Sequence, residues 1–260
     1  MNNIIDINST GLMIIYFLVF INLILVEVLK FKLFKQFLIA ITRMSIQLFI
    51  AGFILKYIFQ LNTFHIIILV FLVMALFASN IILKKAKVPV KNLFFYIFLS
   101  ITLVTLFIGF IFIKIIIGLT PWYEARYFIP LMGMILGNSM NGCALAIERF
   151  YSQIKNQQKE VESLLCLGAS TFEAVKEIII NSLKAASLPY ITSMSGIGLV
   201  FLPGMMTGQI LSGTNPIVAV KYQLSIMIVI FTSVIFSSLL VVLFSYKIFF
   251  DKYGKIKNYE

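Results

Sequence analysis

The chain has 260 residues, of which 61% are hydrophobic and only 12% are charged. Soluble domains average about 45–50% apolar and about 25% charged residues, so this composition excludes a water-soluble globular protein and indicates a membrane protein. The formal net charge of +11 could indicate a nucleic-acid partner in a soluble chain. Here most basic residues lie between long apolar runs, so we expect a lipid bilayer around the chain and no nucleic acid.

Seven apolar runs are long enough to span a bilayer. A helix needs roughly 20 apolar residues to cross about 30 Å of hydrocarbon. The runs are continuous rather than alternating, which favours helices over the strands of a membrane barrel. In chain order they cover residues 11–29, 37–59, 64–83, 93–118, 127–147, 188–211 and 217–246. The sequence therefore predicts an all-α, multi-pass protein of the cell (inner or plasma) membrane, in which residues 1–260 form a single transmembrane domain of seven helices.

The distribution of Lys and Arg over the connections predicts the orientation of these spans. Sixteen of these residues lie in the first, third and fifth connections and in the C-terminal tail. Four lie on the opposite side, namely Lys56, Lys114, Arg126 and Lys221. Because cytoplasmic flanks retain Lys and Arg, we expect the N-terminus outside and the C-terminus inside.

Residues 148–187 form one long polar segment whose apolar residues recur at helical spacing. Gly168 stands where a helix could end in a left-handed cap, and Ser170 with Glu173 makes a capping box. The pattern predicts a helix, a tight turn and a second helix at the inner face of the membrane. Two interpretations of the apolar stripe remain: it packs on the protein's own spans or on lipid headgroups, or it docks a soluble partner.

Residues 162–170 read ESLLCLGAS and resemble the coupling-loop motif of ABC transporter permeases, in which a short cytoplasmic helix inserts into a groove of the ATPase. Glu162 and Gly168 are six positions apart, as the Glu and Gly of that motif are. Further blocks resemble iron-export permeases of the FetB (YbbM) type, whose plant relatives include aluminium-tolerance half-transporters. These blocks are residues 43–59, 130–140, 198–208 and 215–223, in the order of that family. Two positions depart from its pattern: Asn215, where we expect Asp, and Ser195, where we expect Lys.

The resemblance implies an ABC exporter built from two copies of this chain and two copies of a separate ATPase, which binds ATP and Mg. No GxxxxGK(S/T) phosphate-binding loop occurs in these residues, so we expect no enzyme activity and no cofactor in this chain. The cargo that the family implies is iron, with a role in metal homeostasis. The residues expected at the ATPase are Glu162 as a polar anchor, Leu164, Leu165 and Leu167 as apolar contacts, and Gly168 and Ser170 in the turn.

Polar residues within the predicted spans are candidates for the transport pathway. Arg43 and Gln47 project from one face of the second span, and an arginine at mid-bilayer costs at least about 2.5–3.5 kcal/mol on insertion scales. We therefore expect Arg43 to face a partner or a water-filled cavity, where it binds an anionic ligand or makes a structural tie to carbonyl groups or to Gln47. Gly133, Gly137 and Asn141 recur every four residues of the fifth span and form a small-residue face. Close helix packing at this face and a pathway role of Asn138 and Asn141 both remain open.

The sixth span contains the strongest candidate site. Pro203 lacks an N–H and Gly204 follows it, so we expect the helix to break there and to expose carbonyl groups within the protein or in a cavity. Met205 and Met206 lie beside this break. Thioethers suit Cu(I) whereas Fe²⁺ prefers imidazole and carboxylate, and methionine is also an ordinary core filler. With one His and almost no carboxylates in the spans, the sequence assigns no metal ligands.

Two other classes of function have less support in the sequence. An intramembrane enzyme would need paired His or carboxylate residues or an activated nucleophile, and the chain has one His and no HExxH or GxSxG motif. An ion-coupled carrier or channel would need carboxylates within the spans, where Glu27 alone is available near the predicted inner boundary. Within the exporter class, the alternative cargoes are another metal, a metal chelate or a nucleotide sugar.

Overall fold

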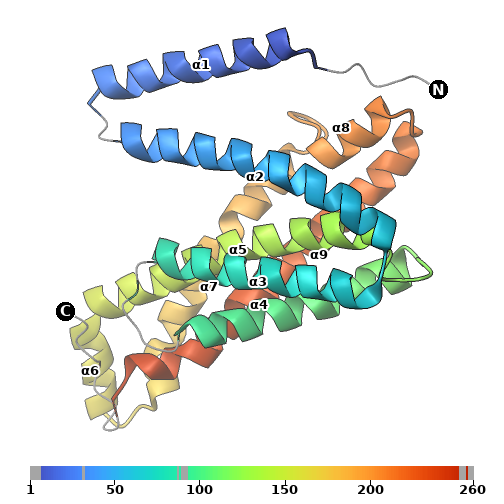
Figure 1. Cartoon of the computed structure of the whole chain (residues 1–260). Coiled ribbons are helices and arrows are strands. Elements are labelled where there is room, and N and C mark those ends of the chain that lie inside the picture. Colours follow the sequence, from blue (N-terminus) through green and yellow to red (C-terminus); the bar gives the residue numbers. More distant parts are fainter. Residues whose placement is uncertain (1–6, 31–32, 87, 89–92, 252–255, 257–260) are drawn as a thin grey trace.

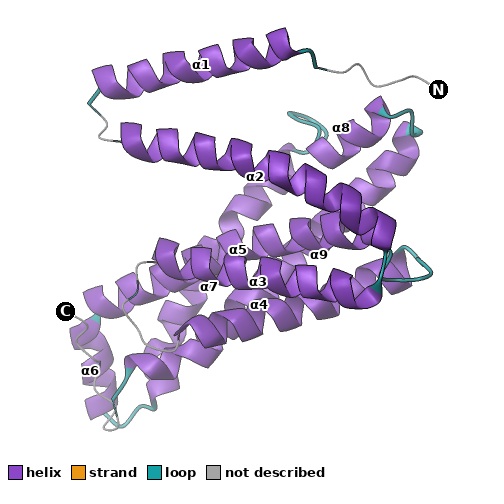
Figure 2. Ribbon diagram, viewed as in Figure 1, coloured by secondary structure: helices purple, strands orange, loops and turns teal. Residues whose placement is uncertain are grey.

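The computed structural model describes residues 7–30, 33–86, 88, 93–251 and 256. These residues form helices joined by turns, with isolated bridges and no strand, so the all-α prediction is confirmed (Figure 2). The α-helices are α1 Ser9–Val28, α2 Phe34–Leu61, α3 Phe64–Ala86, α4 Leu93–Phe110, α5 Ala125–Asn156, α6 Gln158–Cys166, α7 Thr171–Gly196, α8 Gly204–Leu211 and α9 Pro216–Ser245. A π-helical turn, η1 Ile111–Ile116, continues α4, and a 3₁₀ turn, η2 Tyr246–Phe249, follows α9.

Among the described residues, six helical segments are long and apolar enough to cross a membrane. They are α1, α2, α3, α4 with η1, α5, and α9 with η2. The run predicted as a sixth span, residues 188–211, is interrupted as Pro203 and Gly204 predict: α7 ends at Gly196 and α8 begins at Gly204. Gly198 takes a left-handed backbone conformation there, with φ +83°, and Pro203 supplies no N–H for a helical hydrogen bond. A seventh crossing, which α7 and α8 would have to make together, stays a prediction.

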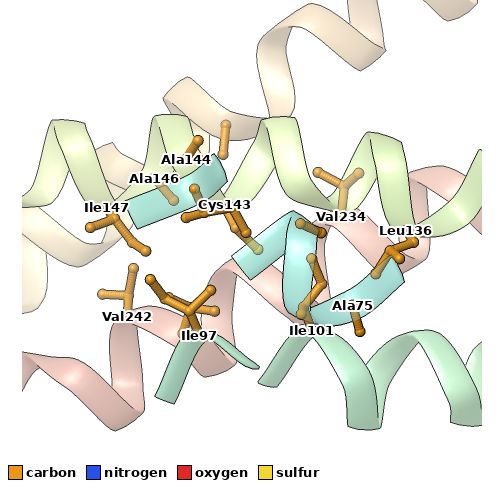
Figure 3. Close-up of a cluster of buried hydrophobic side chains, with 14 of the residues drawn as sticks. Ala75, Ile97, Ile101, Leu136, Cys143, Ala144, Ala146, Ile147, Val234 and Val242 are labelled. Atoms are coloured by element: carbon orange, nitrogen blue, oxygen red, sulfur yellow. The ribbon is translucent and has the colours of Figure 1, made fainter. Parts of the chain in front are cut away.

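Helix α5 is the centre of the fold and packs against α3, α4, α7 and α9. Its buried face carries large side chains such as Phe128 and Met132 at one end and smaller ones such as Cys143 further along. Figure 3 shows Leu136 and Cys143 of α5 among Ala75, Ile101 and Val234 from three other helices. The hydroxyl oxygens of Ser139 and Ser233 are 2.8 Å apart and join α5 to α9 within this apolar surrounding.

Helices α1 and α2 stand away from the bundle for most of their length (Figure 1). Leu23 is the buried residue of α1, and Ile58 that of α2. The hydroxyl groups of Tyr16 and Ser45 are hydrogen bonded at 2.9 Å and join the two helices. The bundle holds the end of α2, where the carboxamide oxygen of Asn62 accepts a 2.9 Å hydrogen bond from the N–H of Ala125. Both helices therefore expose apolar surface. Such a surface fits contact with lipid or with a second protein chain.

The connections alternate between the two ends of the molecule. In Figure 1, residues 62–63, 117–124 and 212–215 lie at one end, whereas α6, the start of α7 and the end of α9 lie at the other. This alternation agrees with the predicted topology, although which end faces the cytoplasm stays a prediction. Six of the basic residues on which that prediction depends lie outside the described residues: Lys32, Lys87, Lys91, Lys252, Lys255 and Lys257.

A close approach of α5 to α9 lies at Gly142 and yields the first prediction. A Cβ at Gly142 would lie 2.5 Å from Cγ1 of Val234, a stiff β-branched side chain. We expect Gly142→Ala to lower the free energy of unfolding in detergent by about 1–3 kcal/mol, because the two helices must separate.

Gly137 provides the matched control on the same helix. A Cβ there meets no atom within 4 Å, so Gly137→Ala should be neutral, or stabilising by up to about 1 kcal/mol through helix propensity. Denaturant titration of both variants measures the difference. Equal stability of the two variants would contradict the packing described here.

Candidate functional site

A short amphipathic helix, α6, follows α5 at the end of the molecule that also carries the end of α9 (Figure 1). Val161 on its inner side is buried, and Leu165 is partly buried against the core. Leu164 and Leu167 on its outer side are 42% and 84% exposed. Of the three leucines predicted as docking contacts, Leu164 and Leu167 are thus accessible. Leu165 instead packs against the core and fastens α6 to the rest of the protein.

The turn after α6 requires a glycine. Gly168 has φ +95°, a conformation that side chains with a Cβ rarely adopt. Its N–H donates to the carbonyl of Leu165 at 3.0 Å, and the N–H of Ala169 donates to the carbonyl of Leu164 at 3.0 Å. These two bonds form a Schellman motif, which satisfies carbonyl groups at the end of α6.

Helix α7 begins with the capping box that the sequence predicts. The N–H of Ser170 donates to Oε2 of Glu173 at 2.8 Å, and the N–H of Glu173 donates to Oγ of Ser170 at 3.3 Å. The pKa of Glu173 lies below its ordinary value, chiefly because its carboxylate accepts a hydrogen bond from the Ser170 side chain. A hydrogen bond from the Ser170 backbone lowers the pKa further. Helix, turn and helix are therefore all confirmed, and both helix ends at the turn are satisfied by bonds within the turn.

The turn is connected to the membrane helices through several side chains. Glu162 is half-buried, and its Oε1 accepts a 2.9 Å hydrogen bond from Nε2 of Gln158, so its carboxylate is held along α6. The ring centroids of Phe172 and Tyr246 lie 5.9 Å apart, which brings the start of α7 against the end of α9. Helix α6 also contacts α5 and α7 directly. A displacement of the turn would consequently act on α5, α7 and α9.

Arg43 and Gln47 are both exposed on α2. With Gln36, Ala40 and Ala51 they form a stripe of polar and small residues along one side of this helix, hereafter the α2 stripe. Neither side chain has a hydrogen-bond partner in the described part of the chain, so the predicted tie of Arg43 to Gln47 is not formed there. Leu55 and Ile58, further along the same side of α2, pack against the core, whereas the part of this side that carries Arg43 and Gln47 stays exposed.

Asn138 and Asn141 each make a contact between elements. The carbonyl of Asn138 accepts a 2.6 Å hydrogen bond from the hydroxyl of Tyr190 on α7, and Oδ1 of Asn141 lies 3.5 Å from Nζ of Lys85 on α3. Lys85, Asn141 and Tyr190 line a cavity of about 410 Å³ with Glu148. The sequence alone did not reveal this cluster, because its members lie on three helices. Lys85 and Glu148 also stand where charged residues commonly flank a membrane span.

The break between α7 and α8 folds back on itself. The N–H of Gly198 donates to the carbonyl of Phe201 at 3.0 Å, and the N–H of Val200 donates to the carbonyl of Gly196 at 2.9 Å. Pro203 caps α8, whose Thr207 hydroxyl donates to the Pro203 carbonyl at 3.1 Å, and Gly204 is the first residue of that helix. The predicted break is confirmed, and several of its backbone groups are satisfied within the loop.

The two methionines on α8 lie in different surroundings. Met205 packs against the core, whereas Met206 lines a cavity between α7, α8 and α9. No group of three or more His, Cys, Asp or Glu side chains that could hold a metal ion occurs in the described ranges. Iron ligands of that kind are therefore not assigned to any residue.

The departures at Asn215 and Ser195 have simple local structures. Oδ1 of Asn215 accepts a 2.9 Å hydrogen bond from the N–H of Ile217, so Asn215 caps α9 ahead of Pro216. Asp would cap the helix in the same way. The hydroxyl of Ser195 donates to the carbonyl of Ile191 within α7 at 3.0 Å.

Comparison with known proteins identifies the relatives of this chain. Residues 9–250 match the model described as Uncharacterised protein family (UPF0014). UPF0014 membrane protein YjkA of Bacillus subtilis is 33% identical over 93% of this chain and 95% of its own length. Probable iron export permease protein FetB of Escherichia coli is 29% identical over 95% of this chain and 93% of its own length.

A plant protein extends this set. Protein ALUMINUM SENSITIVE 3 of Arabidopsis thaliana is 30% identical over 74% of this chain and 69% of its own length. No solved structure matches the chain significantly. The family match covers nearly the whole chain, and the relatives include the iron-export and plant proteins that the sequence blocks resemble. The chain therefore belongs to the UPF0014 family of multi-pass membrane proteins.

Proposed function

We propose that this chain is the membrane-spanning permease subunit of an ATP-driven ABC exporter, with iron as its cargo. Two copies of the chain would form the pathway, and a separate ATPase would dock on the turn between α6 and α7. The single observation that carries this proposal is the doubly capped turn, which presents Leu164 and Leu167 outward at one end of the helical bundle.

The geometry of the turn suits a docking element. Burying one exposed leucine side chain contributes roughly 1.5–3 kcal/mol, and Leu167 is 84% exposed in the single chain. The Schellman motif and the capping box fix the backbone before any partner arrives, so little conformational entropy is lost on binding. Glu162, held by Gln158, would supply the polar contact at the edge of the same surface.

The structure also offers a route by which motion of the turn could reach the pathway. Helix α7 starts at the turn and ends at the break, and Tyr190 joins it to Asn138 on α5. When ATP closes the ATPase dimer, the turn would move with it and would displace α7 and α5 together. The break at residues 197–203 would then take up the strain at the far end of α7.

A second copy of the chain accounts for the α2 stripe. Arg43 at mid-bilayer requires a polar surrounding, and the described part of one chain supplies no partner for its guanidinium. Placing two copies with their α2 stripes toward a shared aqueous cavity would hydrate both arginines. Iron is supported as cargo by the name of the Escherichia coli relative, probable iron export permease protein FetB. A chelate fits this arrangement better than bare Fe²⁺, because Arg43 repels a free cation.

The proposed orientation can be tested with a native cysteine. Cys166 is exposed at the turn, whereas Cys143 is buried. A membrane-impermeant maleimide should therefore label the chain in inverted vesicles or opened cells and leave it unlabelled in intact cells. Thr63→Cys in a Cys166→Ser background is the matched control, since Thr63 is exposed at the opposite end. Labelling of Cys166 from outside would overturn the orientation.

Gly168 tests the coupling role of the turn. In Gly168→Val the left-handed conformation costs about 1–2 kcal/mol, which lowers the ratio of native to non-native turn about 5- to 30-fold. We expect cargo-dependent ATPase activity of the reconstituted complex to fall by a similar factor while the permease stays folded. Gly52→Val is the control, because Gly52 is helical and a Cβ there meets no atom within 4 Å. Full coupling by Gly168→Val would exclude the turn as the coupling element.

The cargo is tested separately from the coupling. In liposomes that contain the permease and its ATPase, Fe²⁺, alone or as its citrate complex, should raise the rate of ATP hydrolysis to a saturating value. The ATPase alone should not respond. Stimulation by another solute and none by either form of iron would remove iron as cargo and leave the permease proposal standing.

A further inference from the structure

A cavity of about 400 Å³ lies between the end of α7, the break, α8 and the first half of α9. Met194 of α7, Met206 of α8 and Met227 of α9 all line it. Each of the three is partly exposed rather than sealed in the core. The break creates this space, because α8 lies against α9 while the chain between α7 and α8 is folded back in a tight loop.

A buried polar residue at the edge of this space has an oxygen without a partner. Gln223 also lines the cavity and is only 3% exposed. Its Oε1 has no hydrogen-bond donor within reach in the described structure. Leaving a buried polar group unsatisfied costs about 1–3 kcal/mol, so Gln223 is poised to accept a hydrogen bond or to ligate a cation.

The methionines are too concentrated here to be ordinary filler. Methionine accounts for 11 of the 260 residues, yet it supplies three of the ten residues that line the cavity. Methionine usually fills irregular gaps in a core because its side chain is flexible. Met194, Met206 and Met227, by contrast, line a cavity and do not fill it. They come from three separate helices and line one cavity, so one ion within it could be reached from three sides.

We propose that Met194, Met206, Met227 and Gln223 form a binding site for a soft monovalent cation, Cu(I) or Ag(I). Thioether sulfur selects soft ions such as Cu(I). All four side chains are neutral, so the charge of the ion is not compensated within the site. Because the cost of transferring an ion into a medium of low dielectric rises with the square of its charge, such a site favours a monovalent over a divalent ion.

The cavity is larger than a bare ion needs, so binding requires the thioethers to turn inward. Each methionine has three rotatable bonds and can do so without movement of its helix. The loop before α8 contains Gly198 and ends at Gly204, which also permits α8 to shift toward α9. This site goes beyond the proposed iron export, and it requires neither the ATPase nor the coupling turn.

Equilibrium binding to the full chain in detergent tests the site. Cu(I) is supplied without oxygen as its coloured bicinchoninate complex, and loss of colour reports transfer to the protein. Every protein carries Cys166→Ser, so that the exposed thiol does not bind copper. We expect the parent to bind one Cu(I) per chain. The affinity should fall about tenfold or more in Met194→Leu, Met206→Leu or Met227→Leu, and the triple variant should take up no Cu(I).

Met205→Leu is the matched control, because Met205 lies on the same helix but packs against the core. It should bind Cu(I) like the parent. Exchanges between Met and Leu usually cost less than about 1.5 kcal/mol of stability, and the thermal unfolding midpoint without copper checks that each variant is folded. Unchanged Cu(I) transfer to the triple variant, or equal losses in Met205→Leu and Met206→Leu, would overturn the proposal.

X-ray absorption of the copper-loaded parent provides a second readout that needs no variant. The site predicts a shell dominated by sulfur, whereas a shell of nitrogen alone would contradict it. Neither measurement involves ATP, so failure of the coupling experiments would leave this site intact. Absence of copper binding would equally leave the permease proposal intact.

Discussion

The hydrocarbon interior of a bilayer offers no hydrogen-bond partners, so each backbone N–H and carbonyl of a spanning segment must be satisfied within the protein. Continuous helices meet this requirement without help, and α3, α5 and α9 do so over 23, 32 and 30 residues. Interruptions need other partners. At the break after α7, the chain supplies several of them from its own loop backbone, and the turn after α6, which we expect outside the hydrocarbon, is closed by backbone bonds as well. The two interruptions flank one helix, α7, and carry the proposed coupling and cation sites.

This arrangement gives α7 a distinct place in the molecule. Its first turn is fixed by Ser170 and Glu173, and its middle is joined to α5 through Tyr190. Its last turn ends at a loop whose Leu199 and Val200 are among the most exposed apolar residues of the chain. One end is thus rigid and accessible to a soluble partner, and the other end has room to change shape. That contrast is what a helix needs in order to transmit a movement from an ATPase to a pathway.

Local patterns in the sequence were sufficient to predict much of this structure. Hydrophobic runs placed most of the long helices, and Gly168, Ser170 and Glu173 predicted the turn because their roles depend on neighbours within three residues. In the run at residues 188–211, Pro203 and Gly204 predicted the break, but its composition did not show that the helix already ends at Gly196. Patterns along the chain could not reveal the cluster of Lys85, Glu148 and Tyr190. The same holds for the cavity of Met194, Met206, Met227 and Gln223, because packing of separate helices creates both.

We propose the turn between α6 and α7 as the surface on which a separate ATPase docks. Hydrogen exchange of the permease in the presence and absence of its ATPase measures this most directly. We expect slower exchange in residues 158–171 on addition of the ATPase, and unchanged exchange in residues 62–63 and 118–124 at the opposite end. Protection at that opposite end with none at the turn would exclude the turn as the docking surface.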